Sequence, residues 1–399
     1  MAAGVELDIL STEKLNVTLV SERLWVGRIL PPELHGCAWP LLKCLMSSTA
    51  NSGERAGFFS FTQDEDELTL MMDDWCHHVF ASSASASAIT YMPRRWRAFE
   101  FRLGALAWEV PGVMSFLSTL MSESQISILK VASYDRDFLL VQETDVAGAS
   151  RLIQERLHLD VDCLKEAMQE KLATRRMGLA AGEGEEGEEG SFSQSRRAEA
   201  PDSEYGDGAS STDGRGGRAG SSRAAEESES DVAAGASDGA HPWSTDDSDG
   251  LYVKVLPTNL VVVRLQLAML SLSTHALIQR LLFSSSRGRR CFWSYTHVED
   301  EVSLIVDDLT LQDFPEEALV GGTSTRWRPL MLAGRSFAFN ETGVVSAMFA
   351  PYEDGVPLLN ISTFSTNVTL VEDSDIERAL SAFKLPHKVL ECEESDGED

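Results

Sequence analysis

Two stretches of the sequence, far apart in the chain, follow the same pattern: FFSFTQDEDELTLMMDD at residues 58–74 and FWSYTHVEDEVSLIVDD at residues 292–308. Their aromatic, hydroxyl and acidic positions coincide without a gap. In each stretch, two apolar runs flank a polar turn, which is typical of a β-hairpin. The chain therefore contains at least one structural motif twice.

Two further matches in the same order extend this repeat. The Trp-Arg pair at residues 96–97 corresponds to the pair at residues 327–328, at an offset of 231. The run SYDRDFLLVQETDV from Ser133 corresponds to TFSTNVTLVEDSDI from Thr363, at an offset of 230. Three collinear matches indicate an internal duplication of the whole folded part.

Within each half, predicted strands alternate with predicted helices. The strand runs form hairpins: FFSF with ELTLMMD, CFWSYT with EVSLIVD, ISILKVAS with FLLVQET, and LLNISTF with VTLVED. Helices are expected at Gly112–Ser122, Val146–Leu157, Gly343–Ala350 and Ser374–Phe383. This order predicts the ferredoxin-like βαββαβ plan twice per half. The expected fold class is α+β, with four small units in two duplicated halves.

The charge of the 399-residue chain is unevenly distributed. The net charge is −29, but residues 181–250 alone contain 18 acids and 5 arginines, and residues 391–399 contain 6 acids and no base. The Gly/Ser-rich acidic stretch is typical of a disordered linker. An acidic chain is also a poor partner for nucleic acid or for an anionic membrane. The predicted domains are 1–85 (unit 1), 86–172 (unit 2), 173–250 (disordered linker), 251–320 (unit 3), 321–388 (unit 4) and 389–399 (acidic tail).

Several features predict a cytosolic protein without cofactor or metal. The most apolar stretch, residues 251–282, is interrupted by charged side chains, so no transmembrane helix is expected. Glu6 and Asp8 stand where a secretory signal needs basic and apolar residues. The six cysteines show no Cys-x-x-Cys spacing, so reduced thiols are expected rather than disulfides or a zinc site.

Several quoted runs also resemble a known family. LPTNLVVVRL from Leu256, AFNETGVVSAMFAPYEDGVPLLNISTF from Ala338 and ISILKVASYDRDFLLV from Ile126 are similar to tandem ACT domains of the CASTOR type. CASTOR proteins are cytosolic arginine sensors of the mTOR pathway, and their ACT units resemble the regulatory domains of aspartate kinases. The resemblance covers residues 5–159 and 251–383. It implies an amino-acid-sensing regulatory protein.

The resemblance also implies a ligand site between the second and fourth ACT units. Ser127 and Ile128 are expected to hold the main-chain end of the ligand. Glu341 is expected to bind the amino group. Thr363 and Phe364 are expected to line the site with backbone carbonyls.

Two positions of the expected ligand site depart from the pattern of the family. A glycine of the family is Ala338 here, which narrows the site, and the aspartate that pairs with the arginine guanidinium is Asn367. A buried cation without its counter-charge binds more weakly by roughly 1.5–3 kcal/mol. The expected ligand is therefore an amino acid, with arginine as one candidate.

Glu341 has a second interpretation, as a solvated acid that caps a helix beginning near Gly343. In the other half its position is occupied by Val110, so the acid exists in one copy only. The repeat therefore predicts one composite site rather than a symmetric pair.

Tyr134, Asp135 and Asp137 lie at the positions of the loop by which CASTOR proteins dock to a signalling complex of the GATOR type; Tyr134 and Asp137 agree with the family, and Asp135 departs from it. The alternative is an ordinary polar turn between two strands. With a ligand at the composite site, the resemblance predicts a ligand-controlled interaction switch. Edge-to-edge pairing of ACT units further predicts a homodimer.

No catalytic site is expected. Cys76, His77 and His78 adjoin, but neighbours in an extended segment or turn point in different directions. The acids at residues 73–74 and 307–308 end equivalent hairpins, which favours a structural role. Two alternatives stay open: a scaffold that binds no ligand, and an allosteric regulatory subunit of an amino-acid metabolic enzyme.

Overall fold

The computed structural model describes residues 7–11, 16–47, 57–102, 112–156, 250–283, 292–299, 301–321, 324–338, 340–353, 355–383 and 385–390. All of these residues belong to one structural unit. The predicted linker up to residue 249 and the predicted tail from residue 391 lie outside the described residues.

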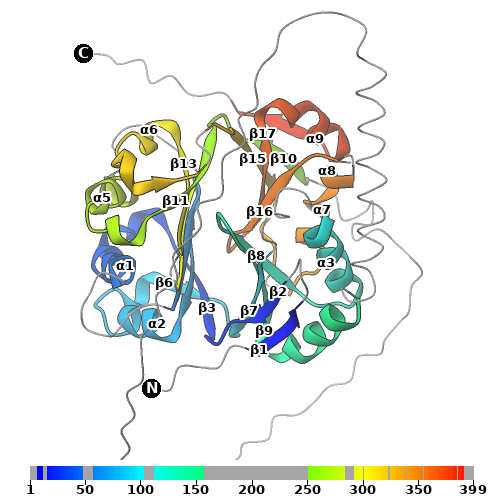
Figure 1. Cartoon of the computed structure of the whole chain (residues 1–399), viewed down its shortest axis with the longest axis horizontal. Helices are drawn as coiled ribbons and strands as arrows, with labels where there is room; N and C mark the ends of the chain where they lie inside the picture. The colour runs from blue at the N-terminus through cyan, green and yellow to red at the C-terminus, as the bar shows by residue number, and fades with distance from the viewer. Residues whose placement is uncertain are drawn as a thin grey trace, which may run out of the picture. The chain divides into compact units, whose positions relative to one another are not determined.

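Unit 1 is a four-stranded antiparallel sheet with two helices, continuous along the chain (Figure 1). Its strand order is β6–β3–β5–β4, which is the order of the predicted βαββαβ plan. Its elements are β3 (Leu24–Ile29), α1 (Ala38–Leu45), β4 (Phe58–Gln63), β5 (Leu68–Asp73), α2 (Asp74–Ala81) and β6 (Ile89–Tyr91).

Unit 3 repeats this arrangement in the C-terminal half. Its strand order is β14–β11–β13–β12, again antiparallel throughout. Its elements are β11 (Leu260–Leu265), α5 (Thr274–Phe283), β12 (Trp293–Val298), β13 (Glu301–Asp307), α6 (Asp308–Leu311) and β14 (Leu319–Val320). The hairpins predicted from the two quoted stretches are thus β4–β5 and β12–β13.

Unit 2 takes its fourth strand from the N-terminal end of its half. Its strand order is β2–β7–β9–β8, with β1 antiparallel on the outer side of β2. Its elements are β1 (Leu7–Ser11), β2 (Asn16–Leu19), β7 (Trp96–Arg102), α3 (Gly112–Glu123), β8 (Ile128–Ala132), β9 (Asp137–Gln142) and a helix over residues 146–156. The predicted division at residue 85 differs from this pairing, because β2 belongs to the sheet of unit 2 and β6 to that of unit 1.

Unit 4 also takes its fourth strand, β10, from the N-terminal end of its half. Its strand order is β10–β15–β17–β16, with β18 parallel on the outer side of β10. Its elements are β10 (Tyr252–Val255), β15 (Trp327–Ala333), α7 (Val344–Ala347), α8 (Ala350–Glu353), β16 (Leu358–Ser362), β17 (Asn367–Glu372), α9 (Ile376–Ala382) and β18 (His387–Val389). The helix expected at Gly343–Ala350 is two short helices instead, and Gly343 precedes the first with a left-handed φ of 84°.

The two halves are joined by an antiparallel ladder between the edge strands β4 and β12. Two hydroxyl pairs reinforce it on one face of the sheet: Ser60 with Thr296 and Thr62 with Ser294, each at 2.9 Å. The ladder removes two open edges, which would otherwise expose unpaired backbone groups. Units 1 and 3 therefore share one continuous sheet.

Units 2 and 4 meet along a different kind of seam. Their edge strands β8 and β16 lie side by side (Figure 1), but the ladders found among the described strands include none between them. Instead, the backbone N–H of Lys130 donates to the Ser362 hydroxyl at 2.9 Å. This seam is held by side chains.

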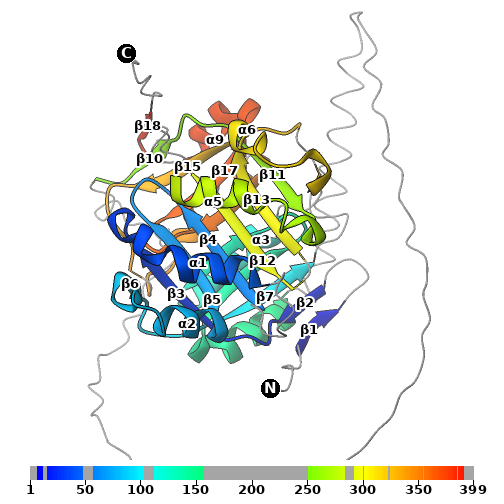
Figure 2. The ribbon, with the colours of Figure 1, turned by 90° about the vertical axis from the view of Figure 1, so that its left-hand side faces the viewer.

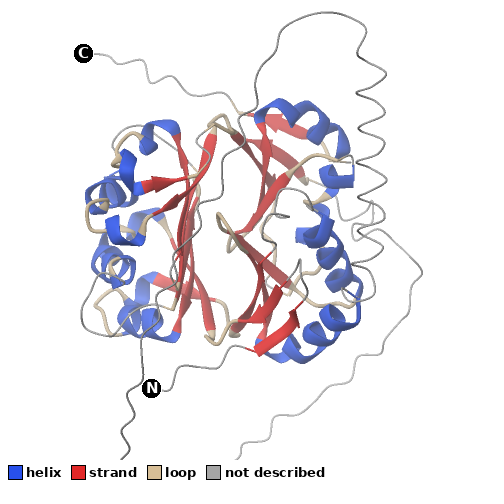
Figure 3. Ribbon diagram, viewed as in Figure 1, coloured by secondary structure: helices blue, strands red, loops and turns tan. Residues whose placement is uncertain are grey.

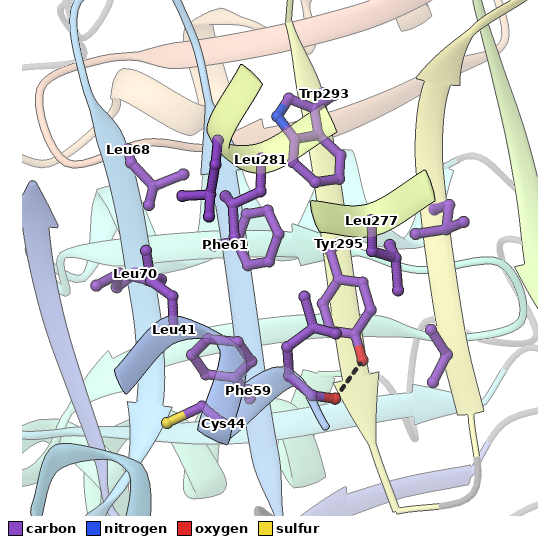
Figure 4. Close-up of a cluster of buried hydrophobic side chains, with 14 of the residues drawn as sticks. Leu41, Cys44, Phe59, Phe61, Leu68, Leu70, Leu277, Leu281, Trp293 and Tyr295 are labelled. Carbon is purple, nitrogen blue, oxygen red and sulfur yellow. Dashed lines mark hydrogen bonds between the residues drawn. The ribbon is translucent and has the colours of Figure 1, made fainter. Parts of the chain in front are cut away.

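The strands form two layers, the sheet of units 1 and 3 and the sheet of units 2 and 4, which are joined by single residue pairs between β3 and β7 and between β11 and β15. The two layers face each other, and the helices cover their outer faces (Figure 3). Figure 2 shows α1 and α5 lying over the sheet of units 1 and 3. In that core, Phe61 packs edge-on against Trp293, with ring centroids 4.9 Å apart, and stacks on Tyr295 at 5.3 Å (Figure 4). Since both faces of the sheets are covered, β5 and β13 are buried at every position.

None of the described helices is long and apolar enough to cross a membrane.

Duplicated aspartates cap the helices that follow the two hairpins. Asp73 accepts a hydrogen bond from the backbone N–H of Cys76 at 2.8 Å, and Asp307 accepts one from Thr310 at 2.8 Å. Asp73 also accepts from the backbone of Phe58 at 3.2 Å. The geometry therefore supports a structural role, helix capping, for Asp73 and Asp307.

We expect Asp73→Ala to lower the free energy of unfolding by about 1–2 kcal/mol, because the substitution removes an N-cap and leaves buried N–H groups without an acceptor. Urea denaturation measures the change. Asp66→Ala is the matched control, since this side chain is exposed and the expected change is within about 0.5 kcal/mol. Equal effects of the two substitutions would contradict the capping role.

Candidate functional site

All seven predicted ligand residues line a single cavity at the seam of units 2 and 4. The volume open to the centre of a water molecule is about 30 Å³, which is room for about two waters. The cavity as it stands is therefore too small for an amino acid. The described lining residues are Met92, Ser127, Ile128, Leu129, Phe337, Ala338, Glu341, Val344, Val345, Ser362, Thr363, Phe364, Thr366 and Asn367.

The wall from unit 2 includes Ser127 and Ile128, where the chain enters β8. Ser127 is buried, and its hydroxyl donates to the backbone carbonyl of Glu341 at 3.5 Å, across the seam. Ile128 begins β8 and belongs to the apolar core beneath the helices of units 2 and 4. The predicted pair thus contacts unit 4 directly.

The opposite wall is the tight turn between β16 and β17. The backbone N–H of Thr363 donates to the carbonyl of Thr366 at 2.9 Å, which closes the turn. Asn367 begins β17, is 1% exposed, and donates its amide to Asn360 at 3.1 Å and to Ser362 at 3.0 Å. Both amide protons of Asn367 are thus already hydrogen-bonded.

The rim is a loop closed by an ion pair that the sequence analysis did not predict. Both carboxylate oxygens of Glu341 accept from the Arg335 guanidinium, one of them at 2.9 Å. The backbone N–H of Ala338 donates to the same carboxylate at 3.3 Å. The hydrogen bonds from Arg335 lower the pKa of Glu341, so the carboxylate is charged at neutral pH.

The alternative interpretation of Glu341 as a helix cap is wrong. The residue that precedes α7 is Gly343, and no side chain caps this helix. Glu341 instead pairs with Arg335, six residues earlier in the same irregular loop. No helical or strand periodicity relates two residues of such a loop, so the pair gave no signal in the sequence.

The turn between β16 and β17 also contacts unit 1. The backbone N–H of Phe364 donates to the Thr69 hydroxyl at 2.8 Å. Ser365 donates from its backbone and its hydroxyl to the two carboxylate oxygens of Glu67, at 2.9 and 2.8 Å. Arg28 lies 3.4 Å from the same carboxylate and 5.0 Å from the centre of the Phe364 ring. One wall of the cavity is thus anchored to the other sheet.

The duplication repeats this contact between unit 2 and unit 3. The backbone N–H of Asp135 donates to Glu301 at 3.3 Å, and the Arg136 guanidinium lies 3.2 Å from the same carboxylate. Burial raises the pKa of Glu301. Arg136 also lies 3.0 Å from the buried carboxylate of Glu100. The equivalent of Arg136 in unit 4 is Thr366, so only this copy carries the cation.

The predicted docking residues lie in this second turn. Tyr134 is half-buried against unit 3, where a Cβ at Gly321 would overlap its hydroxyl. Asp135 is exposed and lies 3.3 Å from Arg264. Asp137 forms an ion pair at 3.0 Å with the buried Lys130. Each of the three residues therefore has a partner within the chain, and their role in docking stays a prediction.

The Cys76–His78 segment is helical, not the extended segment or turn that was expected, because Asp73 caps the start of α2 just before it. Cys76 is buried in the core, and burial raises the pKa of its thiol. The His77 ring stacks on Trp25 with centroids 3.9 Å apart. The two side chains have separate, structural surroundings.

Two regions of this fold are ACT domains. The ACT domain family matches residues 91–155 and 323–384, which are the central parts of units 2 and 4. The fold class predicted from the repeat is confirmed at these two regions.

The chain is similar along most of its length to proteins named cytosolic arginine sensor for mTORC1 subunit 1. It is 20% identical to the protein of Rattus norvegicus over 368 residues, with 91% of this chain and 94% of that protein covered. The identity to the Homo sapiens protein is 20% over 369 residues, covering 91% and 95%. Among solved structures, the regulatory subunit of aspartate kinase from Thermus flavus is 11% identical, covering 37% of this chain and 98% of that chain, with a TM-score of 0.27.

We expect Arg136→Ala to lower the free energy of unfolding by about 3–5 kcal/mol, because it leaves the buried carboxylates of Glu100 and Glu301 without this cation. Thermal or urea unfolding measures the loss. Arg102→Ala is the matched control: this side chain also pairs with Glu100, but it is 42% exposed and should cost about 1 kcal/mol or less. A loss for Arg136→Ala no larger than for the control would refute the role assigned to this contact.

Proposed function

We propose that this protein senses an amino acid and regulates a signalling partner. The ligand, with arginine as one candidate, would bind at the seam of units 2 and 4. One observation carries the proposal: the seven predicted residues converge on one cavity. Two of them, Ser127 and Glu341, lie 214 positions apart in the chain. An interface between repeated domains is a common location for such a site.

The relatives support the same proposal. These relatives, 20% identical over nearly the full length, are named as cytosolic arginine sensors for mTORC1. By this likeness we propose a cytosolic location, a partner complex of the GATOR type, a homodimer and no enzymatic activity. The domain assignment into four ACT units with an acidic linker belongs to the same proposal.

The proposed mechanism is a shift between two arrangements of the units. A ligand would displace the rim residues 335–338 and Glu341, since the present volume has room for about two waters. It would also contact Thr363 and Phe364, whose turn is hydrogen-bonded to unit 1. A ligand changes the arrangement only by its difference in affinity for the two states, so the contact of this turn with unit 1 is where that difference would arise.

The small volume of the cavity favours a second candidate function. A scaffold, or the regulatory subunit of a metabolic enzyme with its ligand site elsewhere, would keep the seam closed. Ligand-dependent stability separates the sensor from the scaffold, and variants of the seam residues separate it from a regulatory subunit whose site lies elsewhere. A binder gains about 2.7 kcal/mol at a hundredfold excess of ligand over its Kd, and a scaffold gains nothing.

We expect one or more amino acids to raise the Tm of the full chain, and Glu341→Ala and Ser127→Ala to reduce or abolish that rise. Glu341 would lose the charge that binds the amino group, and Ser127 the hydroxyl that holds the main-chain end. Differential scanning fluorimetry against all twenty amino acids measures both effects.

The matched controls are Glu377→Ala and Ser381→Ala, two exposed positions on α9 that should leave the ligand response unchanged. The absence of a shift with every amino acid would reject the sensor and leave the scaffold. A shift that Glu341→Ala and Ser127→Ala both retain would place the site elsewhere.

We expect Tyr134→Ala and Asp135→Asn to weaken capture of a purified GATOR-type complex by the full chain. Thr144→Ala, an exposed position beyond β9, is the control for the surface. Because Tyr134 also packs on unit 3, each variant must first show an unchanged Tm. Undiminished capture by both folded variants would assign the turn to the contact between units 2 and 3 alone.

A further inference from the structure

Asn367 and Ser362, which line the cavity, belong to a network of neutral amides and hydroxyls. Asn367 and Asn360 are 1% and 0% exposed and exchange reciprocal amide hydrogen bonds, the one from Asn367 at 3.1 Å. The second amide proton of Asn367 goes to Ser362 at 3.0 Å, and that of Asn360 goes to Thr369 at 3.1 Å. These bonds use all four amide protons of the two residues.

The duplication shows that the fold accepts full charges at the same two positions. Lys130 and Asp137 of unit 2 occupy the places of Asn360 and Asn367 in unit 4, at the common offset of 230 residues. They form an ion pair at 3.0 Å, in which Lys130 is buried and Asp137 half-buried, with the ammonium 5.1 Å from the centre of the Phe349 ring. Neutral side chains at these two positions are thus specific to unit 4 and are not a requirement of the fold.

The charges at the rim are also balanced. Among the described residues that line the cavity, Glu341 carries the one carboxylate, and its partner Arg335 lies beside it. The two charges match those of an α-amino acid: the α-ammonium can pair with Glu341 and the α-carboxylate with Arg335. A ligand with no net charge therefore replaces this ion pair charge for charge.

We propose that the site selects an α-amino acid with a neutral side chain over arginine or lysine. The inference rests on the proposed amino-acid site and names the class of its ligand. A cationic side chain would be buried against Asn367 without a counter-charge, which costs desolvation that nothing offsets. A neutral side chain avoids this cost, and a hydroxyl or carboxamide could also donate to the remaining lone pair of the Asn367 carbonyl oxygen.

The test compares Kd values of the full chain for glutamine, asparagine, threonine and leucine with those for arginine and lysine, by isothermal titration calorimetry. We expect at least one neutral amino acid to bind the wild type roughly tenfold or more tightly than arginine, which is the weakening that a missing counter-charge causes. Asn367→Asp should shift the ratio of the two Kd values toward arginine by about tenfold or more. Its carboxylate can accept from Asn360 and Ser362, so the network tolerates it.

Asn259→Asp is the matched control, because it adds the same charge outside the cavity, where Asn259 accepts a hydrogen bond from Arg328 at 2.8 Å. It should keep the ratio of the wild type. Tightest binding of arginine by the wild type, or an unchanged ratio in Asn367→Asp, would overturn the neutral ligand and leave the proposed function standing. Binding of no amino acid would overturn both. If Asn367→Asp fails to fold, the wild-type ratio alone decides.

Discussion

The antiparallel ladder between β4 and β12 is the constraint on which the other contacts depend. It joins two equivalent edge strands, so the two halves are related by an approximate twofold arrangement, and it brings the other pair of edge strands, β8 and β16, side by side. The first seam is closed by backbone hydrogen bonds along six residue pairs and by two hydroxyl pairs. The second is held by side chains such as Ser362. The candidate site lies at the second seam, where movement does not require breaking a backbone ladder.

The duplication supplies one scaffold and two different sets of polar contacts. In both halves a buried glutamate at the start of a strand, Glu67 or Glu301, accepts the backbone of a turn from the opposite sheet. Only the turn of unit 2 adds an arginine to this contact, and Arg136 links it to a second buried carboxylate. The contact between units 2 and 3 is therefore fixed by charge, whereas the contact between units 4 and 1 depends on hydrogen bonds to Glu67 and Thr69 and on the Arg28 ion pair. The two turns occupy equivalent positions in the repeat but make different polar contacts.

Much of the fold could be predicted from the sequence, because the periodicity of strands and helices is visible within short stretches and the duplication shows it twice. The hairpins at residues 58–73 and 293–307 and the helix α3 lie where the pattern placed them. The origin of the fourth strand of unit 2 could not be predicted in this way: β2 pairs with β7 some eighty positions later, and no short-range pattern reports such a pairing. The site shows the same division. The seven lining residues came from a family resemblance, but Arg335 did not, because its pairing with Glu341 depends on the path of an irregular loop.

Phe364 shows how the cavity and the scaffold are connected. Its side chain lines the cavity, its backbone N–H is held by Thr69 of unit 1, and Arg28 lies over its ring. Any molecule that enlarges the cavity toward this residue must therefore act on hydrogen bonds between the two sheets. On the other side, Ser127 bonds to the rim loop and leads into β8, which continues to the turn at Tyr134. The chain thus links both walls of the cavity to the two turns that hold the sheets together, so a change at the seam of units 2 and 4 cannot stay confined to it.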